Sequence, residues 1–152
     1  MIIDIYSRKV VGYALGKTLS AELTLAALQM AITTRKVENL IHHSDQGIQY
    51  TCKDYIKILK DNGIRISMSE KGNPYNNAFA ESFIKTLKQE EVYLWQYETY
   101  LDVIERIPYF ILDVYNRKRL HSALGYRPPE EFESLLAEKG SQEVEEAKTL
   151  FV

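Results

Sequence analysis

The chain has a single cysteine, Cys52, and only four prolines among its 152 residues. One thiol cannot form an internal disulfide, so the sequence excludes a disulfide-stapled secreted scaffold and favours a reducing compartment. No apolar run approaches the roughly 18 residues that a membrane span requires, and the N-terminus lacks the flanking residues of a signal peptide. These absences together predict a cytoplasmic protein.

An excess of positive charge is also lacking, since the formal net charge is −2. Up to Phe132 the chain has 17 Lys and Arg against 16 Asp and Glu, and from Glu133 onward it has 2 against 5. Net charge therefore gives no long-range attraction to a polyanion, and any nucleic-acid binding must come from local patches. The composition predicts one globular domain over residues 1–132, followed over residues 133–152 by an acidic tail that we expect to be frayed or disordered.

Strand and helix patterns alternate along the first half of the chain. Two β-rich runs joined by three residues predict a hairpin. We expect a hairpin over 2–15, a helix capped by Ser20 that ends near Arg35, and a strand over 37–42. A helix opened by a Thr51–Asp54 capping box and a strand over 64–67 should follow, and then a loop over 69–77. A helix is expected to begin at Ala78, and a helical stretch over 97–118 should be kinked or split by Pro108. This alternation predicts an α/β layered fold.

The stretch HHSDQGIQY places Asp45 just past the end of a predicted strand, in a turn that contains Gly47. An aspartate in a turn usually bonds its own backbone, and that is the simpler interpretation. In open α/β sheets, however, ligand-binding residues gather at the carboxyl ends of strands. Asp45 is therefore a candidate site residue.

Glu81 lies in the first turn of its predicted helix, where the helix dipole favours a carboxylate. Lys85 and Lys88 follow at four and seven residues, so they project from the same face as Glu81. A solvated salt-bridge stripe is the simpler interpretation. Phosphodiester chemistry needs the same combination, because carboxylates hold divalent ions while lysines position the backbone.

The basic cluster of Arg117, Lys118 and Arg119 follows a long predicted helix. Cations there stabilise the C-terminal end of the helix dipole or contact DNA phosphates, and the sequence favours neither alternative. Zinc is not indicated, because the spacing of the histidines and Cys52 matches no common four-ligand pattern.

Three motifs in order resemble the catalytic core of bacterial insertion-sequence transposases of the retroviral integrase superfamily, the DDE enzymes with a ribonuclease H-like fold. They are HSDQGIQYT, NPYNNAFAESFIKTLKQE and YNRKRLHSALGYRPPEEF. Asp45 matches the second acid of the family, Glu81 the third, and Lys88 the basic residue seven positions beyond it.

The resemblance implies that Asp45 and Glu81 are catalytic carboxylates that bind Mg²⁺ or Mn²⁺. It also implies DNA as the partner, contacted by Lys85, Lys88 and the cluster 117–119. By the same resemblance, the working form is expected to be a homo-oligomer on DNA.

The family's first catalytic aspartate lies on its first strand, upstream of the element that IIDIYSRKVVGYAL resembles. Asp4 matches the aspartate of the second strand and is not assigned a catalytic role. We therefore expect a ribonuclease H-like mixed sheet, flanked by helices, that lacks the first and central strand of the family order 3-2-1-4-5. Its two inner edges must then pair with each other, with a strand of another copy, or with a separate upstream segment.

Two carboxylates offer too few ligands for the two divalent ions that this chemistry uses. The sequence thus predicts the core of a DNA transposase that is truncated and catalytically impaired. The alternative is a non-catalytic remnant that binds DNA or oligomerises.

Overall fold

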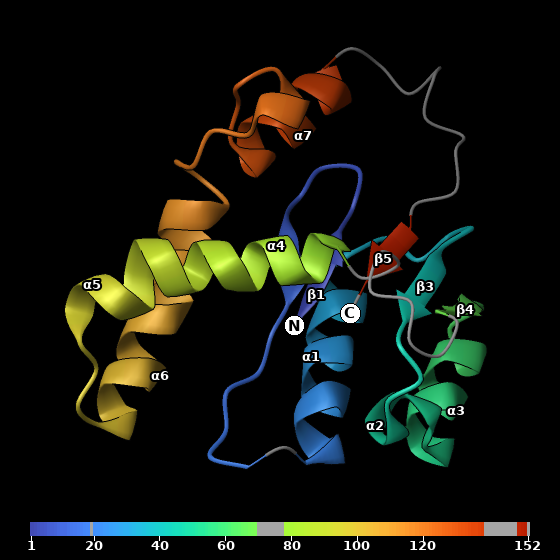
Figure 1. The fold of residues 1–152 in the computed structure, drawn as a ribbon. Coiled ribbons are helices and arrows are strands. Elements are labelled where there is room, and N and C mark those ends of the chain that lie inside the picture. The colour runs from blue at the N-terminus through green and yellow to red at the C-terminus, as the bar shows by residue number, and fades with distance from the viewer. Residues whose placement is uncertain (19, 70–77, 139–148, 152) are drawn as a thin grey trace.

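A mixed five-stranded sheet forms the centre of the computed structural model, which describes residues 1–18, 20–69, 78–138 and 149–151 (Figure 1). Its strands lie in the order β2-β1-β5-β3-β4. Their bounds are β1 Ile2–Asp4, β2 Val10–Gly12, β3 Ile41–Ser44, β4 Arg65–Met68 and β5 Thr149–Phe151.

Helices account for most of the remaining described residues. The α-helices are α1 Ala21–Thr34, α2 Ile48–Thr51, α3 Lys53–Asp61, α4 Ala78–Leu87, α5 Tyr93–Trp95, α6 Tyr100–Tyr109 and α7 Pro129–Glu138. Two π-helices, η2 Lys88–Val92 and η3 Phe110–Tyr115, and one 3-10 helix, η4 Ser122–Leu124, complete the set. In the described part of the chain, none of these helices is long and apolar enough to cross a membrane.

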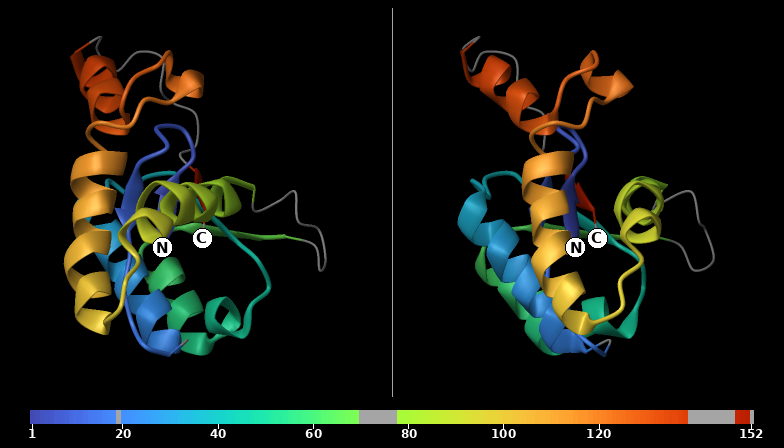
Figure 2. Two further views of the ribbon diagram at one scale, coloured as in Figure 1. Left: turned by 60° about the vertical axis from the view of Figure 1, so that its left-hand side comes forward. Right: turned by 90° about the vertical axis from the view of Figure 1, so that its left-hand side faces the viewer.

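Two hydrophobic clusters cover the two faces of the sheet. Alternate residues of β1 point to opposite faces, so Ile2 belongs to one cluster and Ile3 to the other. The first cluster packs α1 and α3 against the sheet, and the second packs α4, α6 and η3 against it. Figure 2 shows α1 and α3 on one side of the strands and α4 on the other. The expected α/β architecture is confirmed.

Most of the expected elements are present. The hairpin, α1, β4 and the start of α4 lie where the sequence places them, and β3 ends directly before Asp45. The capping box expected at Thr51 is wrong, because the Thr51 hydroxyl donates to carbonyls of its own turn, at Gly47 and Ile48. The described capping box is instead at Thr99 and Asp102, which open α6.

The helical stretch around Pro108 does not end at the proline. Pro108 lies within α6, and the chain continues as the π-helix η3 from Phe110. Residues 70–77, which make up nearly all of the expected loop, lie outside the described residues.

The central strand of the sheet is β5, from the C-terminal end of the chain. It runs antiparallel to β1, with Asp4 opposite Leu150, and parallel to β3, with His42 opposite Leu150. The inner edges of β1 and β3 therefore pair neither with each other, nor with a strand of another copy, nor with an upstream segment, and all three expectations are wrong. A segment of the same chain, downstream rather than upstream, satisfies both edges.

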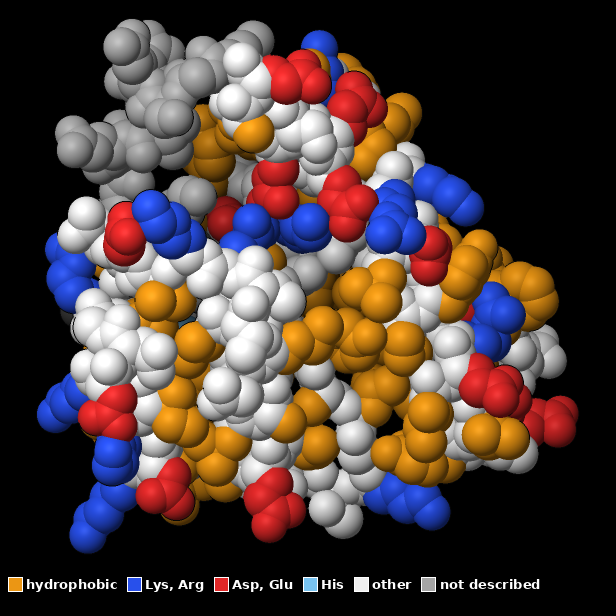
Figure 3. Space-filling view, turned by 180° about the vertical axis from the view of Figure 1, so that it is seen from behind, with side chains coloured by type: hydrophobic (Ala, Val, Ile, Leu, Met, Phe, Trp, Pro, Cys, Tyr) orange, Lys and Arg blue, Asp and Glu red, His pale blue; other side chains and the backbone are white. Residues whose placement is uncertain are grey.

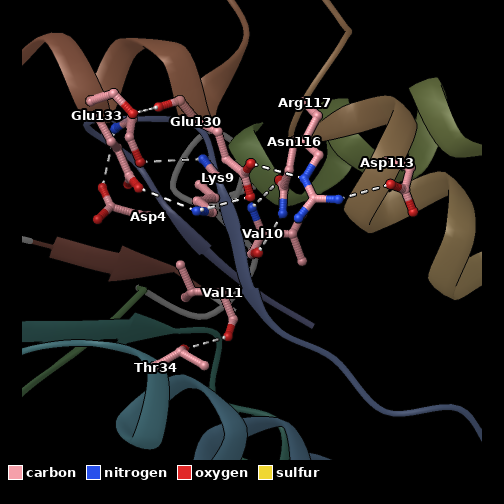
Figure 4. A network of polar contacts seen from close by, with 12 residues as sticks. Asp4, Lys9, Val10, Val11, Thr34, Asp113, Asn116, Arg117, Glu130 and Glu133 are labelled. Atoms are coloured by element: carbon pink, nitrogen blue, oxygen red, sulfur yellow. Dashed lines mark hydrogen bonds and ion pairs between the residues drawn. The ribbon is translucent and has the colours of Figure 1, made fainter.

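The segment after η3 is tied to the hairpin by the buried side chain of Asn116 (Figure 4). Its Oδ1 accepts from the Val10 backbone N–H at 3.0 Å, and its Nδ2 donates to the Val10 carbonyl at 3.0 Å. These two bonds replace a ladder partner along the outer edge of β2. The Asn116 carbonyl also accepts from the Glu130 N–H at 3.0 Å, which fixes the start of α7.

Ion pairs hold α7 against the hairpin and α1 (Figure 4). Lys9 lies 3.3 Å from Glu130 and 3.4 Å from Glu133, and Arg35 pairs with Glu133. Burial raises the pKa of the Glu133 carboxyl, but the hydrogen bond from Arg35 and the nearby cations outweigh it and lower the pKa below its usual value. Because α7 runs past Phe132, the boundary expected between the domain and the acidic tail falls inside this helix. Most of the expected tail, residues 133–152, lies outside the described residues.

Replacing Asn116 by alanine is expected to leave both Val10 backbone groups without their partners in a buried site. A buried unsatisfied group costs about 1–3 kcal/mol, so we expect a destabilisation of about 2–4 kcal/mol for Asn116→Ala. Chemical denaturation would measure it. Asn116→Asp keeps the acceptor but sets a buried carboxylate oxygen against the Val10 carbonyl, so it should be no more stable than Asn116→Ala. Equal stability of the two variants and the unchanged chain would contradict the proposed clamp.

Leu150→Pro is expected to remove a backbone N–H from the middle of the sheet. The loss should be about 1–3 kcal/mol, or roughly 3–9 °C in Tm, with faster amide exchange in β1 and β3. Leu150→Ala, which keeps the N–H, is the matched control. Identical exchange in β3 for the two variants would show that β5 does not join the sheet.

Candidate functional site

Asp45 lies in the exposed turn that joins β3 to α2. Its Oδ1 accepts a hydrogen bond from the Gly47 N–H at 2.8 Å. This is the bond to its own turn that an aspartate in a turn usually forms. The turn is held against the end of β4, because the Gln46 side chain donates to the Ser69 carbonyl at 3.1 Å and the Ser69 N–H to the Ser44 carbonyl at 2.9 Å. Asp45 is thus fixed at the carboxyl end of two neighbouring parallel strands.

The histidines beside Asp45 have structural roles. His42 is buried, its Nε2 lies 3.0 Å from the Tyr55 hydroxyl, and burial lowers its pKa to about 4. His43 contacts the Ser67 and Ser69 hydroxyls at 2.9 and 3.2 Å. Their contacts link β3 to α3 and β4.

Glu81 and Lys85 of α4 and Lys88, the first residue of η2, come together on the exposed side of this continuous helical segment. They line a pocket of about 460 Å³, called the α4 pocket below, with Ala80, Ile84, Gln89 and Tyr93. The sequence-based expectation that these three charged residues share one face is confirmed. Asp45 is not among the lining residues of this pocket.

The opposite side of α4 fixes the orientation of the pocket. Phe83 is 2% exposed and packs edge-on against Tyr115, with ring centroids 4.8 Å apart. Near the start of the helix, the Arg8 guanidinium lies 3.9 Å from the centre of the Phe79 ring. Phe79 is two residues before Glu81, so the β1–β2 turn helps to set the position of the first turn that contains Glu81.

A buried carboxylate follows the pocket residues along the chain. Glu91, in η2, is 3% exposed. Its Oε1 accepts from the Tyr97 hydroxyl at 2.7 Å and from Arg106 Nε at 2.6 Å. Burial, reinforced by the bond to Glu91, raises the pKa of Tyr97 to about 12. Glu91 therefore joins η2 to α6 through its Oε1.

The basic cluster is mostly occupied by partners within the chain. Arg117 pairs with Asp113 at 2.9 Å and Glu130 at 3.0 Å, and these bonds raise its pKa. Arg119 forms a two-pronged pair with Glu90, its Nη2 lying 2.9 Å from Oε1. Lys118 is exposed, with its ammonium 6.0 Å from the Tyr109 ring centre. The contacts of the two arginines favour a structural role for them.

The described carboxylates do not cluster into a metal site. Across residues 1–18, 20–69, 78–138 and 149–151, no three His, Cys, Asp or Glu side chains lie close enough together to hold a metal ion. Asp4 is buried, with its Oδ1 bonded to the Tyr6 and Ser7 N–H groups and its Oδ2 3.6 Å from Arg35. The described residues therefore do not form a complete site for two divalent ions.

The pocket residues that sequence reasoning missed are Ala80, Ile84, Gln89 and Tyr93. At about 100° per residue, an α-helix places Tyr93 roughly 140° around the axis from Lys88. The i to i+5 bond of the π-helix η2 reduces this difference, and no residue periodicity in the sequence indicates the π-helix.

Two family models match the chain, and both describe the integrase core domain. One matches residues 1–74 and the other residues 62–129. Together they span the sheet strands β1 to β4 and the α4 pocket.

Curated proteins similar to this chain include transposases of insertion sequences. It is 42% identical over 132 residues to the transposase for insertion sequence element IS904 of Lactococcus lactis, covering 86% of this chain and 52% of that protein. It is 43% identical over 130 residues to the insertion element IS600 uncharacterized 31 kDa protein of Shigella sonnei, covering 85% and 48%. Transposase InsF for insertion sequence IS3A of Escherichia coli is 39% identical over 135 residues, covering 88% and 47%. The chain spans about half the length of these relatives.

Glu91→Ala is expected to leave Arg106 and Tyr97 without their common partner. Because Arg106 is 30% exposed, water offsets part of the loss, and we expect a destabilisation of about 2 kcal/mol. The Arg106 guanidinium lies 3.7 Å from the ring centre of Trp95, the one tryptophan in the sequence, so its fluorescence should change as well. Glu90→Ala is the control, and an unchanged Trp95 emission in Glu91→Ala would contradict the predicted coupling.

Proposed function

Because this chain belongs to the integrase core domain family, we propose that it is the DNA-handling core of an insertion-sequence transposase, impaired in catalysis as it stands. The observation that supports this most is the convergence of Glu81, Lys85 and Lys88 on the α4 pocket. Two lysines on one face of a helix suit the phosphates of a DNA backbone. An acid within the same pocket would repel phosphate unless a cation lies between them.

The proposed cation is Mg²⁺ or Mn²⁺, with Asp45 and Glu81 as its carboxylate ligands. Such an ion would lie between the Glu81 carboxylate and a DNA phosphate, and its positive charge would offset the repulsion between them. The described residues provide no third carboxylate nearby, so the chain's own contribution is to bind and orient DNA through Lys85 and Lys88. Of the basic cluster, Lys118 is the residue we propose as a further phosphate contact.

The sheet order supports the proposal of impaired catalysis. With β1, β2, β3 and β4 taken as the family's strands 2, 3, 4 and 5, β5 occupies the position of strand 1. It runs antiparallel to β1 and parallel to β3. Thr149, Leu150 and Phe151 include no acid, so we propose that a strand without the family's first catalytic aspartate fills the centre.

The alternative function is a non-catalytic module that binds DNA or oligomerises. Apolar side chains gather on the half of the molecule where α6 lies (Figure 3). On α6 and η3, Leu101 is 60% exposed, Ile104 44% and Leu112 39%. An exposed apolar stripe of this kind favours contact with another protein, and we propose a second copy of the chain.

A strand-transfer assay with Mg²⁺ or Mn²⁺ tests the proposed function. The 152-residue chain is expected to bind a DNA duplex but to join DNA no faster than the Glu81→Gln variant. Lys85→Ala with Lys88→Ala should weaken binding and reduce its salt dependence by about two phosphate contacts. Lys36→Ala, at an exposed lysine outside the pocket, is the control.

Each outcome separates the parts of the proposal. Robust joining that Glu81→Gln abolishes would show an active enzyme and refute the impairment. Unchanged DNA affinity of the double lysine variant would refute the α4 pocket as the DNA site. For the non-catalytic alternative, the variant that combines Asp45→Asn with Glu81→Gln should bind DNA as tightly as the unchanged chain, both with and without divalent metal. A large metal-dependent loss of affinity in this variant would count against the alternative.

A further inference from the structure

Tyr93 lies on the same face of the α4–η2 helix as the charged pocket residues. Its backbone N–H donates to the Lys88 carbonyl, the i to i+5 bond that defines a π turn. Residues five apart then lie on successive turns of one face, whereas in an α-helix they point in widely different directions. Tyr93 is therefore the next residue along the row that Glu81, Lys85 and Lys88 begin.

The same π turn directs Glu91 into the protein. The ion pair of Glu91 with Arg106 and its bond from Tyr97 hold the turn in place. The inward position of Glu91 and the outward position of Tyr93 are thus two results of one backbone irregularity. Such π turns occur often at functional sites.

The Tyr93 ring is placed to receive a flat ligand. Tyr93 is 66% exposed and lines the α4 pocket with Ile84 and the two lysines. The nearby Trp95 is 57% exposed, but the Arg106 guanidinium lies over one face of its ring at 3.7 Å, and Trp95 does not line the pocket. An exposed aromatic face beside cations is the combination with which proteins bind single-stranded nucleic acid.

The spacing along the helix matches the spacing of nucleotides. At about 1.5 Å per residue, Lys88 lies roughly 10 Å from Glu81 along the helix axis, and Tyr93 lies roughly 17 Å from Glu81. At the rise of about 3.4 Å per nucleotide of a strand within a duplex, these distances correspond to about three and five nucleotides, and an unstacked strand spans them with fewer. A strand whose phosphates contact Lys85 and Lys88 would therefore bring one of its next bases to Tyr93.

We propose that Tyr93 is a stacking platform for an unpaired nucleobase of the DNA strand whose phosphates bind Lys85 and Lys88. This inference rests on the proposed DNA binding of the α4 pocket and extends it from the backbone to a base. Stacking accepts any base, so Tyr93 would favour unpaired over paired DNA without selecting a sequence.

Binding of single-stranded oligonucleotides of about 12 nucleotides to the 152-residue chain tests the proposal. Each oligonucleotide contains one 2-aminopurine, moved stepwise along the strand, and Mg²⁺ is present to supply the cation proposed between Glu81 and phosphate. We expect fluorescence quenching at one position, lost in Tyr93→Leu together with a roughly 5- to 100-fold weaker Kd. Tyr93→Phe keeps the ring and should keep both signals.

Tyr126→Leu is the matched control, since Tyr126 is 72% exposed and does not line the pocket. Circular dichroism of each variant verifies the fold. The stacking proposal would be overturned if Tyr93→Leu bound within twofold of the unchanged chain, or if Tyr126→Leu lost as much affinity as Tyr93→Leu. Either result would favour a protein partner for the exposed Tyr93 ring.

The two levels of the proposal fail in different ways. If Lys85→Ala with Lys88→Ala loses binding while Tyr93→Leu does not, only the stacking inference falls. If the unchanged chain binds no oligonucleotide, or if the double lysine variant binds as tightly as the unchanged chain, the DNA site itself falls and the inference with it.

Discussion

Backbone pairing across β5 is the constraint on which the rest of the structure depends. Strands β1 and β3 belong to opposite halves of the sheet, and each has an inner edge whose N–H and C=O groups need partners. Only three residues, Thr149–Phe151, satisfy both edges. The two hydrophobic clusters lie on the two faces of the sheet that this pairing joins, so the position of α4 on its face, and with it the α4 pocket, depends on a continuous sheet.

The second requirement is that the segments after α6 remain attached to the hairpin. Asn116 bonds both backbone groups of Val10, and the pairs of Lys9 and Arg35 with α7 act at the same end of the hairpin. The motif YNRKRLHSALGYRPPEEF, which suggests a basic DNA-contacting segment, is therefore largely structural. Its asparagine clamps β2, and the arginines at 117 and 119 have acidic partners within the chain.

The candidate site combines a motif readable from residue spacing with a feature that is not. Glu81, Lys85 and Lys88 share a face because three- and four-residue steps return to the same side of an α-helix. Tyr93 joins them only because η2 is a π-helix, and η2 is stabilised by the contacts of Glu91 with residues of later segments. A carboxylate that looks like one more solvated charge in the run KQEEV is thus the residue that shapes the end of the pocket.

The sequence by itself determined the alternation of strands and helices, the place of Asp45 after β3, and the shared face of Glu81, Lys85 and Lys88. These features depend on neighbours within a few residues, through side-chain periodicity and turn chemistry. Tertiary structure alone decided that β5 fills the centre of the sheet, that Asn116 clamps Val10, and that Tyr93 turns toward the pocket. Each of these needs a partner far along the chain, and a local pattern of residues contains no information about which distant group will satisfy a given hydrogen bond.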